Sequence, residues 1–400
     1  MSEPGPFGAD GPFGGIPFLG ELAKMLGGAG GAGWENARQL AVGIATGGTS
    51  EANVDPVERM RIEQLARVAE LHVADLTGLP TSPGGGALSV LPVNRTRWVG
   101  DTLAAYRPLV ERLAGSLGPP PDLTEALARA EPDPADPFGG MLEGLVGALQ
   151  PMMVTMTAGS MVGHLARRCF GQYDLPIPRS GDELLLIVPN LDEFGQGWSL
   201  PPDDLRLWVC IHEIAHHAVL GVPHVRAALD ELLAAYAASF RTDPEEIQRA
   251  LGPVELSDPA SMAGLGDLFR DPGALLGALR SPEQEAIQPR LGALVAVVVG
   301  VVDDVLDRVG GRLLADYAML TEALRRRRVE ASESDRFVER LLGLELTQAT
   351  YDRGTRFVEG VRERAGDEGL RRLWSGPEAL PTPNEVDAPG LWLARLDLLA

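Results

Sequence analysis

The sequence has few of the features that place a protein outside the cell or in a membrane. Two cysteines, Cys169 and Cys210, occur in 400 residues, which is too few for a disulfide framework. The longest apolar run, residues 291–302, is 12 residues long, whereas a membrane-spanning helix needs about 20. The chain does not begin with a basic segment followed by an apolar one, so it predicts no secretory signal. We therefore expect a cytoplasmic protein.

Positive charge is also scarce. The 35 Lys and Arg residues are outnumbered by 56 Asp and Glu residues, which gives a formal net charge of −21. Such a surface repels phosphate backbones and anionic lipids, so nucleic acid and membrane are not expected as main partners. Hydrophobic residues make up 45% of the chain and charged residues 23%, which are values typical of a folded globular protein.

The chain divides by composition into a short flexible segment and one large domain. Residues 1–32 hold ten Gly and four Pro, and such a segment cannot bury enough surface to offset the entropy lost on ordering. Residues 33–400 are expected to form a helical domain. Two stretches rich in Pro, Gly and acid, 118–137 and 252–285, are expected to be loops, and the second is a candidate flap over the site.

Helical periodicity dominates this domain, and one segment predicts a strand. The strand is expected at 184–188, and the helices at 55–76, 95–116, 142–170, 291–309 and 313–374. A further helix is expected to begin with Ser199 as its N-cap, followed by prolines and acids, and to end near Leu220. Four consecutive arginines, 325–328, are expected on a solvated face. The end of the chain from Pro377 looks like a loop.

One motif is typical of a metal-binding site, namely His212-Glu213-Ile214-Ala215-His216. Residues four apart share one face of a helix, so both imidazoles can reach one zinc ion at about 2.0–2.1 Å. Glu213 can then act as the general base on a zinc-bound water that attacks a peptide or amide carbonyl. The chain is therefore predicted to be a zinc-dependent metallohydrolase, namely a peptidase that acts on peptides or proteins.

The third metal ligand is left open by the motif. A metzincin places its third histidine six residues after the second, and here that position is Val222. His224, beyond the predicted helix end, is a weaker candidate. The later apolar helix offers Asp303 and its neighbours, which would either bind the metal or orient a ligand histidine.

Three stretches around this motif resemble the actinobacterial zincin-like metallopeptidase family. They are Gly171-Gln-Tyr-Asp-Leu-Pro-Ile-Pro178, the strand with its Pro189-Asn190 end, and 198–216. The resemblance is specific at 171–217 and looser over the rest of the chain. It implies a mainly α zincin-like fold with a minor strand element, zinc at His212 and His216, and Glu213 as the catalytic base.

The sequence departs from this family at one position. Relatives tend to carry a Glu-Gly pair in the later helix, with the Glu four residues ahead of an Asp. The matching stretch here is Val299-Gly300 followed by Asp303, so the resemblance implies that the usual third ligand is missing. Either Asp303 completes the metal site, or the chain is a degenerate zincin that acts as a binding or scaffold protein.

Overall fold

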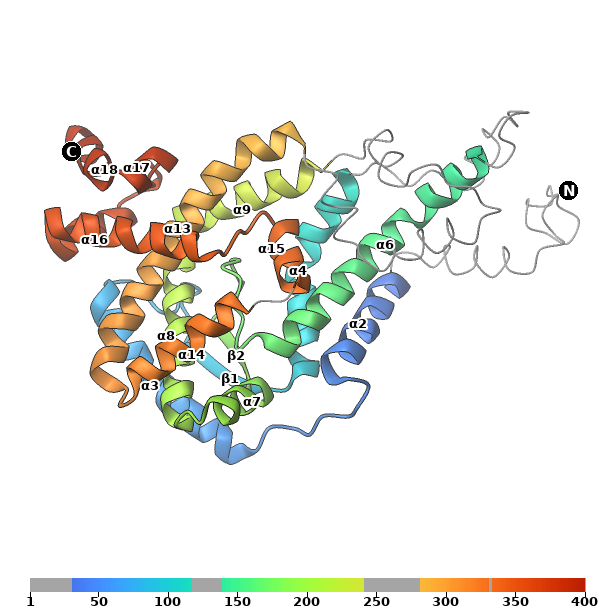
Figure 1. The fold of residues 1–400 in the computed structure, drawn as a ribbon, viewed down its shortest axis with the longest axis horizontal. Helices are drawn as coiled ribbons and strands as arrows, with labels where there is room; N and C mark the ends of the chain where they lie inside the picture. Colours follow the sequence, from blue (N-terminus) through green and yellow to red (C-terminus); the bar gives the residue numbers. More distant parts are fainter. Residues whose placement is uncertain (1–30, 117–138, 241–280, 331–332, 400) are drawn as a thin grey trace, which may run out of the picture.

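The computed structural model describes residues 31–116, 139–240, 281–330 and 333–399. Most of the predicted flexible segment 1–32, the loop 118–137 and nearly all of the candidate flap 252–285 lie outside these residues. Within them the architecture is mainly helical, as predicted, with a single small sheet. Figure 1 shows the helices packed around the sheet, and none of the helices described is long and apolar enough to cross a membrane.

Most of the helices match predicted segments, but the helix expected at 291–309 begins at Pro282, inside the expected loop 252–285, and the helices at 188–198 and 223–238 are not predicted. In chain order the helices are α2 (Gly31–Thr46), α3 (Pro56–Thr77), α4 (Arg95–Ser116), α6 (Gly139–Arg168), α7 (Val188–Trp198), α8 (Pro202–Gly221), α9 (Pro223–Ala238), α13 (Pro282–Leu313), α14 (Tyr317–Val329), α15 (Glu333–Leu341), α16 (Gln348–Arg371), α17 (Pro383–Asp387) and α18 (Pro389–Leu399). The long periodic pattern over 313–374 is divided among three of them. Polar side chains mark the starts of two helices: Asp55 is the N-cap of α3, and Thr347 is the N-cap of α16.

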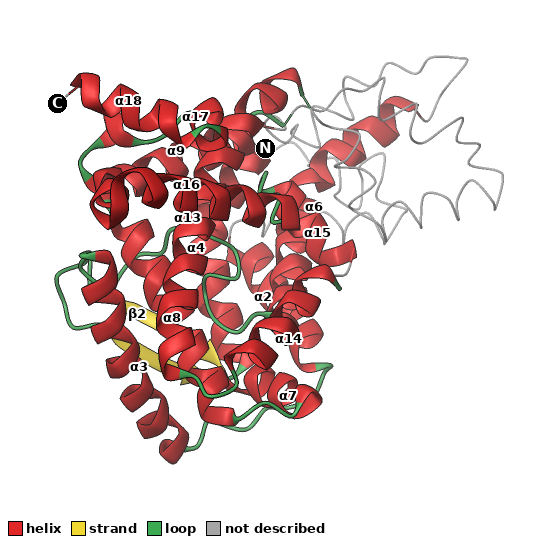
Figure 2. Cartoon of the chain, turned by 60° about the vertical axis from the view of Figure 1, so that its left-hand side comes forward, coloured by secondary structure: helices red, strands yellow, loops and turns green. Residues whose placement is uncertain are grey.

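Two parallel strands, β1 (Ser89–Val93) and β2 (Glu183–Ile187), form the sheet, with Ser89 opposite Glu183. Four of the five β2 residues are buried, because helices cover the sheet (Figure 2). The predicted strand is thus confirmed, whereas β1 was not predicted. Its sequence, Ser-Val-Leu-Pro-Val, is short and contains a proline, which argues against a strand in the sequence but is tolerated here because β1 is an edge strand.

The helix α8 that carries the histidine motif begins later than predicted. Ser199 has φ 53° and ends α7 in the left-handed conformation, while Pro201 occupies the N-cap of α8. The prediction that Ser199 caps α8 is therefore wrong. The residues that do favour this helix start are Pro202 at its first position and the acids of its first turn, which suit the positive end of the helix dipole.

The 32-residue helix α13 lies at the centre of the fold and packs against α8, α9 and α16. Ser281 and Gln284 form a reciprocal capping box at its start, which satisfies two backbone N–H groups. Gly300 of α13 meets Gly354 of α16 so closely that a Cβ on Gly354 would lie 2.0 Å from the carbonyl oxygen of Ala296. Only glycine allows these two helices to approach so far.

The end of the chain is ordered, contrary to the loop predicted from Pro377. A capping box between Thr382 and Glu385 starts α17, and Pro389 starts α18. Trp392 is fully buried, and its indole N–H donates to the carbonyl oxygen of Ala379 at 2.7 Å. Prolines that suggest a loop in the sequence here occupy first turns of short helices, where they are favourable.

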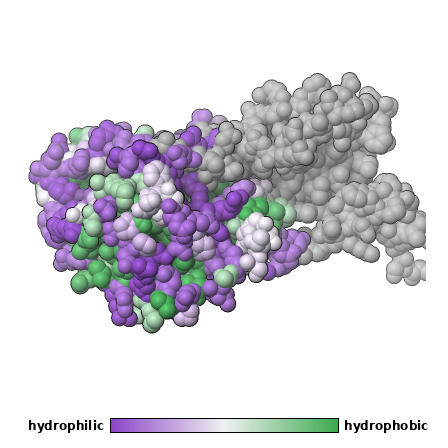
Figure 3. Space-filling view, turned by 60° about the horizontal axis from the view of Figure 1, so that its bottom comes forward, coloured by the Kyte–Doolittle hydropathy of each residue, from purple (hydrophilic) through white to green (hydrophobic). Residues whose placement is uncertain are grey.

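The surface in Figure 3 is mostly hydrophilic, with scattered hydrophobic atoms. The most exposed large apolar side chains of α3 are Val57, Met60 and Leu71, which are 65%, 57% and 68% exposed. The pattern 55–76 predicts this helix correctly, and these three apolar side chains lie on its solvent-facing side.

Candidate metal centre

Helix α8 is almost completely enclosed, and the histidine motif lies in its second half. From Leu205 to Leu220 every residue is buried except His212, whose side chain is 14% exposed. Arg206 is buried too, and it pairs with Glu58 of α3 and with Asp192 of α7. These ion pairs fix the helix between its neighbours. Within the motif, His212 is the residue most exposed to solvent.

The two imidazoles lie together, as the spacing predicts. The ring centroids of His212 and His216 are 4.4 Å apart. The Nδ1 atom of His216 lies 3.0 Å from the carbonyl oxygen of His212, and Nδ1 of His212 lies 3.0 Å from Oε1 of Glu213. Both partners are acceptors, so in the neutral rings Nδ1 carries the proton and donates. This tautomer leaves the lone pair on Nε2 of each ring, which is the atom that a metal would bind.

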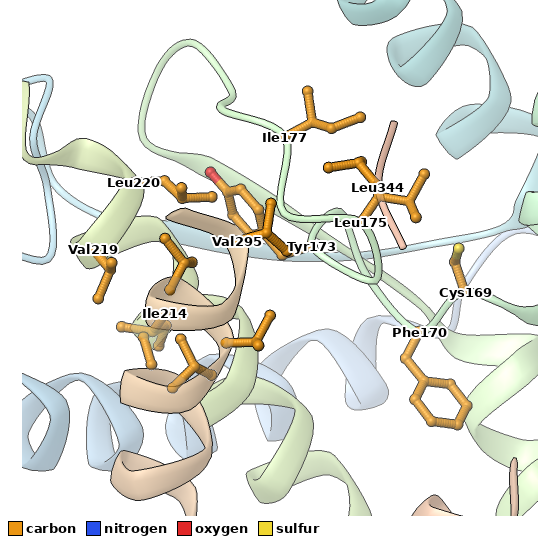
Figure 4. Packing of buried hydrophobic residues seen from close by; sticks show 14 of the residues in the cluster. Cys169, Phe170, Tyr173, Leu175, Ile177, Ile214, Val219, Leu220, Val295 and Leu344 are labelled. Carbon is orange, nitrogen blue, oxygen red and sulfur yellow. The ribbon is translucent and has the colours of Figure 1, made fainter. Parts of the chain in front are cut away.

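Aromatic side chains hold both rings in place. Trp208 stacks on His212 with centroids 5.2 Å apart, and Tyr173 stacks on His216 at 5.8 Å with nearly parallel planes. Figure 4 shows Tyr173 in the same apolar cluster as Ile214 of α8 and Val295 of α13. Burial lowers the pKa of His216 well below its ordinary value, and the nearby His212 and Arg328 add to this effect. The ring is therefore neutral at physiological pH.

Glu213 is inside the protein rather than beside an open site. Its side chain has 0% exposure, and Oε2 accepts hydrogen bonds from the backbone N–H groups of Gln172 at 2.7 Å and Tyr173 at 3.0 Å. A Cβ at Gly171 would lie 2.2 Å from the carboxyl carbon of Glu213. The segment Gly171–Tyr173 thus forms a cradle for this carboxylate, and glycine is needed at its first position.

The cradle is itself held rigidly. Oδ2 of Asp174 accepts from the backbone N–H groups of Phe170 and Gly171, and the indole N–H of Trp98 donates to the carbonyl oxygen of Gly171 at 2.7 Å. The N–H of Ile187, at the end of β2, donates to the carbonyl oxygen of Phe170. The small sheet therefore positions the cradle against α8.

His217, the residue after the motif, has its own set of contacts. Its Nδ1 lies 2.9 Å from the hydroxyl of Tyr173, and its Nε2 lies 3.4 Å from Oδ1 of Asp182. Asp182 in turn accepts from the backbone N–H groups of Gly84 and Gly86. This chain of contacts supports Tyr173, and through it the ring of His216.

Asp303, the expected third ligand, is already paired with an arginine. Asp303 forms an ion pair with Arg328, with N–O distances of 3.2 and 3.5 Å, and Val299 is 2% exposed on the same helix. His224, the weaker candidate, has its Nε2 atom 2.9 Å from the carbonyl oxygen of Leu373. Within the described residues no group of three or more His, Cys, Asp or Glu side chains is arranged to hold a metal ion.

A pocket of about 60 Å³ opens beside His212. Its walls include Trp208, Phe170, Tyr351 and three arginines, among them Arg327 and Arg328 of α14. The expectation that residues 325–328 form a solvated face is therefore wrong for the last two. Arg327 lies over the ring of Phe170 at 3.7 Å, and Arg328 over that of Tyr351 at 4.1 Å. A charge run gives no sign of which members turn inward, so the sequence could not identify these residues.

Comparison with known proteins agrees with the helical architecture. Residues 33–393 match the model of the family described as zincin-like metallopeptidase. A crystal structure of a putative hydrolase with a novel fold from Chloroflexus aurantiacus is similar, with 24% identity and a TM-score of 0.61. The match covers 91% of this chain and 98% of that one. The search of curated proteins gave no match.

Proposed function

Because this chain belongs to the zincin-like metallopeptidase family, we propose that it keeps the two-histidine half of a zincin centre and acts as a binding protein rather than a peptidase. Family membership supports a metallohydrolase in general terms, with zinc as the usual metal and peptides or proteins as the substrates. The residues of this chain depart from that chemistry at one point, the third ligand, and this departure carries the proposal.

The donor set of the described residues does not fit a catalytic zinc ion. Such an ion needs three protein ligands and one open position for water. His212 and His216 supply two, with both Nε2 atoms in the suitable tautomer. On α13, Val299 stands where the resemblance implies a carboxylate, and Asp303 is paired with Arg328. Two imidazoles alone bind zinc weakly, so we derive no catalytic step that depends on the metal.

The surroundings of Glu213 support the same proposal. A general base must lie within hydrogen-bond reach of the water that it deprotonates. Here both carboxylate oxygens already have partners, namely two backbone N–H groups and Nδ1 of His212. Glu213 therefore serves to fix the cradle and the ring of His212. In this arrangement we assign it a structural role, and action as a base would require it to exchange one of these contacts for the water.

The pocket beside His212 is the place where a ligand would bind. Its aromatic walls, Trp208 and Tyr351, suit apolar or aromatic side chains, and its guanidinium groups suit backbone carbonyl oxygens. A segment of a peptide or protein fits this chemistry better than nucleic acid does, since the chain carries a net charge of −21. We expect this binding to occur in the cytoplasm.

A second function, zinc-dependent peptide or amide hydrolysis, is favoured by one specific observation. The tautomers of His212 and His216 present both Nε2 lone pairs together, as zinc binding requires. In this alternative, Asp303 would leave Arg328 and become the third ligand, and Glu213 would leave its cradle to act as the base.

The experiment that separates these functions joins metal analysis with a peptidase assay. The purified chain is dialysed against zinc, its zinc content is measured by elemental mass spectrometry, and it is then incubated with a library of quenched fluorescent peptides. We expect substoichiometric zinc and no cleavage above that of the Glu213→Gln variant. Stoichiometric zinc that is lost in His216→Ala, together with cleavage that is lost in Glu213→Gln, would establish the hydrolase instead.

A further inference from the structure

A positive charge of the protein itself lies in the pocket beside His212. Arg328 lines the same pocket as His212, and its charge contributes to lowering the pKa of His216. The guanidinium group thus shares this small pocket with the ring of His212. The sequence gives no hint of this arrangement, because Arg328 is the last of four consecutive arginines.

This arginine is fixed from two sides. Both of its terminal nitrogens contact the carboxylate of Asp303, in the paired geometry that makes Arg–carboxylate contacts specific. Its guanidinium also lies 4.1 Å from the ring centroid of Tyr351, which is a cation–π contact. The side chain is only 28% exposed. It is therefore an integral part of the site rather than a mobile surface residue.

We propose that Arg328 is a built-in cation that keeps a divalent metal from binding beside His212. It opposes metal binding in two ways, and this inference rests on the proposed function. Its charge repels a second cation in a partly buried site, where Coulomb interactions are stronger than in water. It also engages Asp303, the carboxylate of α13 that is expected to complete the metal site.

Zinc affinity measured by competition with a chromophoric chelator tests this inference. Arg328→Gln removes the charge and releases Asp303, so we expect zinc to bind at least about tenfold more tightly, a change of about 1.4 kcal/mol. Arg328→Lys keeps the charge and should give no comparable gain. Arg326→Gln is the matched control, because Arg326 lies on the same helix and pairs with Glu322 at the surface.

The same substitution is repeated in a background that restores a carboxylate, Val299→Glu. There the Arg328→Gln change should again tighten zinc binding, while circular dichroism shows that each variant is folded. Equal zinc affinities for wild type, Arg328→Gln and Arg326→Gln would overturn the role of Arg328 and leave the proposed function standing. Tight zinc binding by the wild type would instead contradict the proposed function, whatever Arg328→Gln does.

Discussion

The cradle around Glu213 leads to a prediction that depends on one methyl group. In Gly171→Ala the added Cβ would lie 2.2 Å from the carboxyl carbon of Glu213 and 2.5 Å from Oε2. The φ of Gly171 is not positive, so alanine suits the backbone and the effect comes from the contact alone. The carboxylate must move away from the N–H groups of Gln172 and Tyr173.

The magnitude follows from those two hydrogen bonds. A hydrogen bond to a charged group contributes about 1.5–3 kcal/mol, so weakening both should lower the free energy of unfolding by about 3 kcal/mol or more. Gly100→Ala is the matched control, because a Cβ there meets nothing within 4 Å and alanine favours a helix by about 1 kcal/mol. Urea unfolding followed by tryptophan fluorescence measures both variants. A Gly171→Ala protein within about 0.5 kcal/mol of wild type would refute the cradle.

A double-mutant cycle identifies the contact as the cause. Glu213→Ala removes the carboxylate with which the new methyl group collides. The double variant Gly171→Ala/Glu213→Ala should therefore lose less stability than the two single changes added together, by about 1 kcal/mol or more. Additive losses would mean that Gly171 is needed for some reason other than Glu213.

Two further predictions concern the contacts that hold the site. Backbone hydrogen bonds from Gly84 and Gly86 lower the pKa of Asp182 below its ordinary value. The stability that this group provides is thus present above its unfolded pKa of about 3.9 and is lost as the pH falls through the folded value. Asp182→Asn should flatten the loss of unfolding free energy between about pH 5 and 3, and an unchanged slope would contradict this role. Arg206→Gln leaves Glu58 without its buried partner and should cost about 3–5 kcal/mol in thermal or urea unfolding. The exposed Arg97→Gln should cost less than about 1 kcal/mol, and equal losses would show that burial of Arg206 is unimportant.

The sequence predicts the parts of this site that depend on local spacing. Two histidines four residues apart on an apolar helix must lie on one face, and the structure places them there. The mainly helical fold and strand β2 follow from periodicity in the same way. Val299, where a carboxylate is expected, is also visible in the sequence alone.

Features that depend on contacts between distant segments could not be predicted in this way. The cradle is made of backbone N–H groups, which every residue type carries, so Gly171–Tyr173 offers no side-chain signal for it. The inward turn of Arg328 depends on Asp303 and Tyr351, which lie far from it in the sequence. Ser199 has the composition of a helix cap, but α7, which ends just before it, determines its conformation.

The zinc dissociation constant of the wild-type chain, beside that of Val299→Glu, tests the central claim most directly. Equilibrium dialysis with elemental analysis gives both values under the same conditions. The missing third ligand predicts that the wild type binds zinc weakly and that Val299→Glu binds it at least about 100-fold more tightly, a change of about 2.7 kcal/mol. A wild-type chain that already holds one zinc ion with submicromolar affinity, and gains nothing from Val299→Glu, would contradict the account.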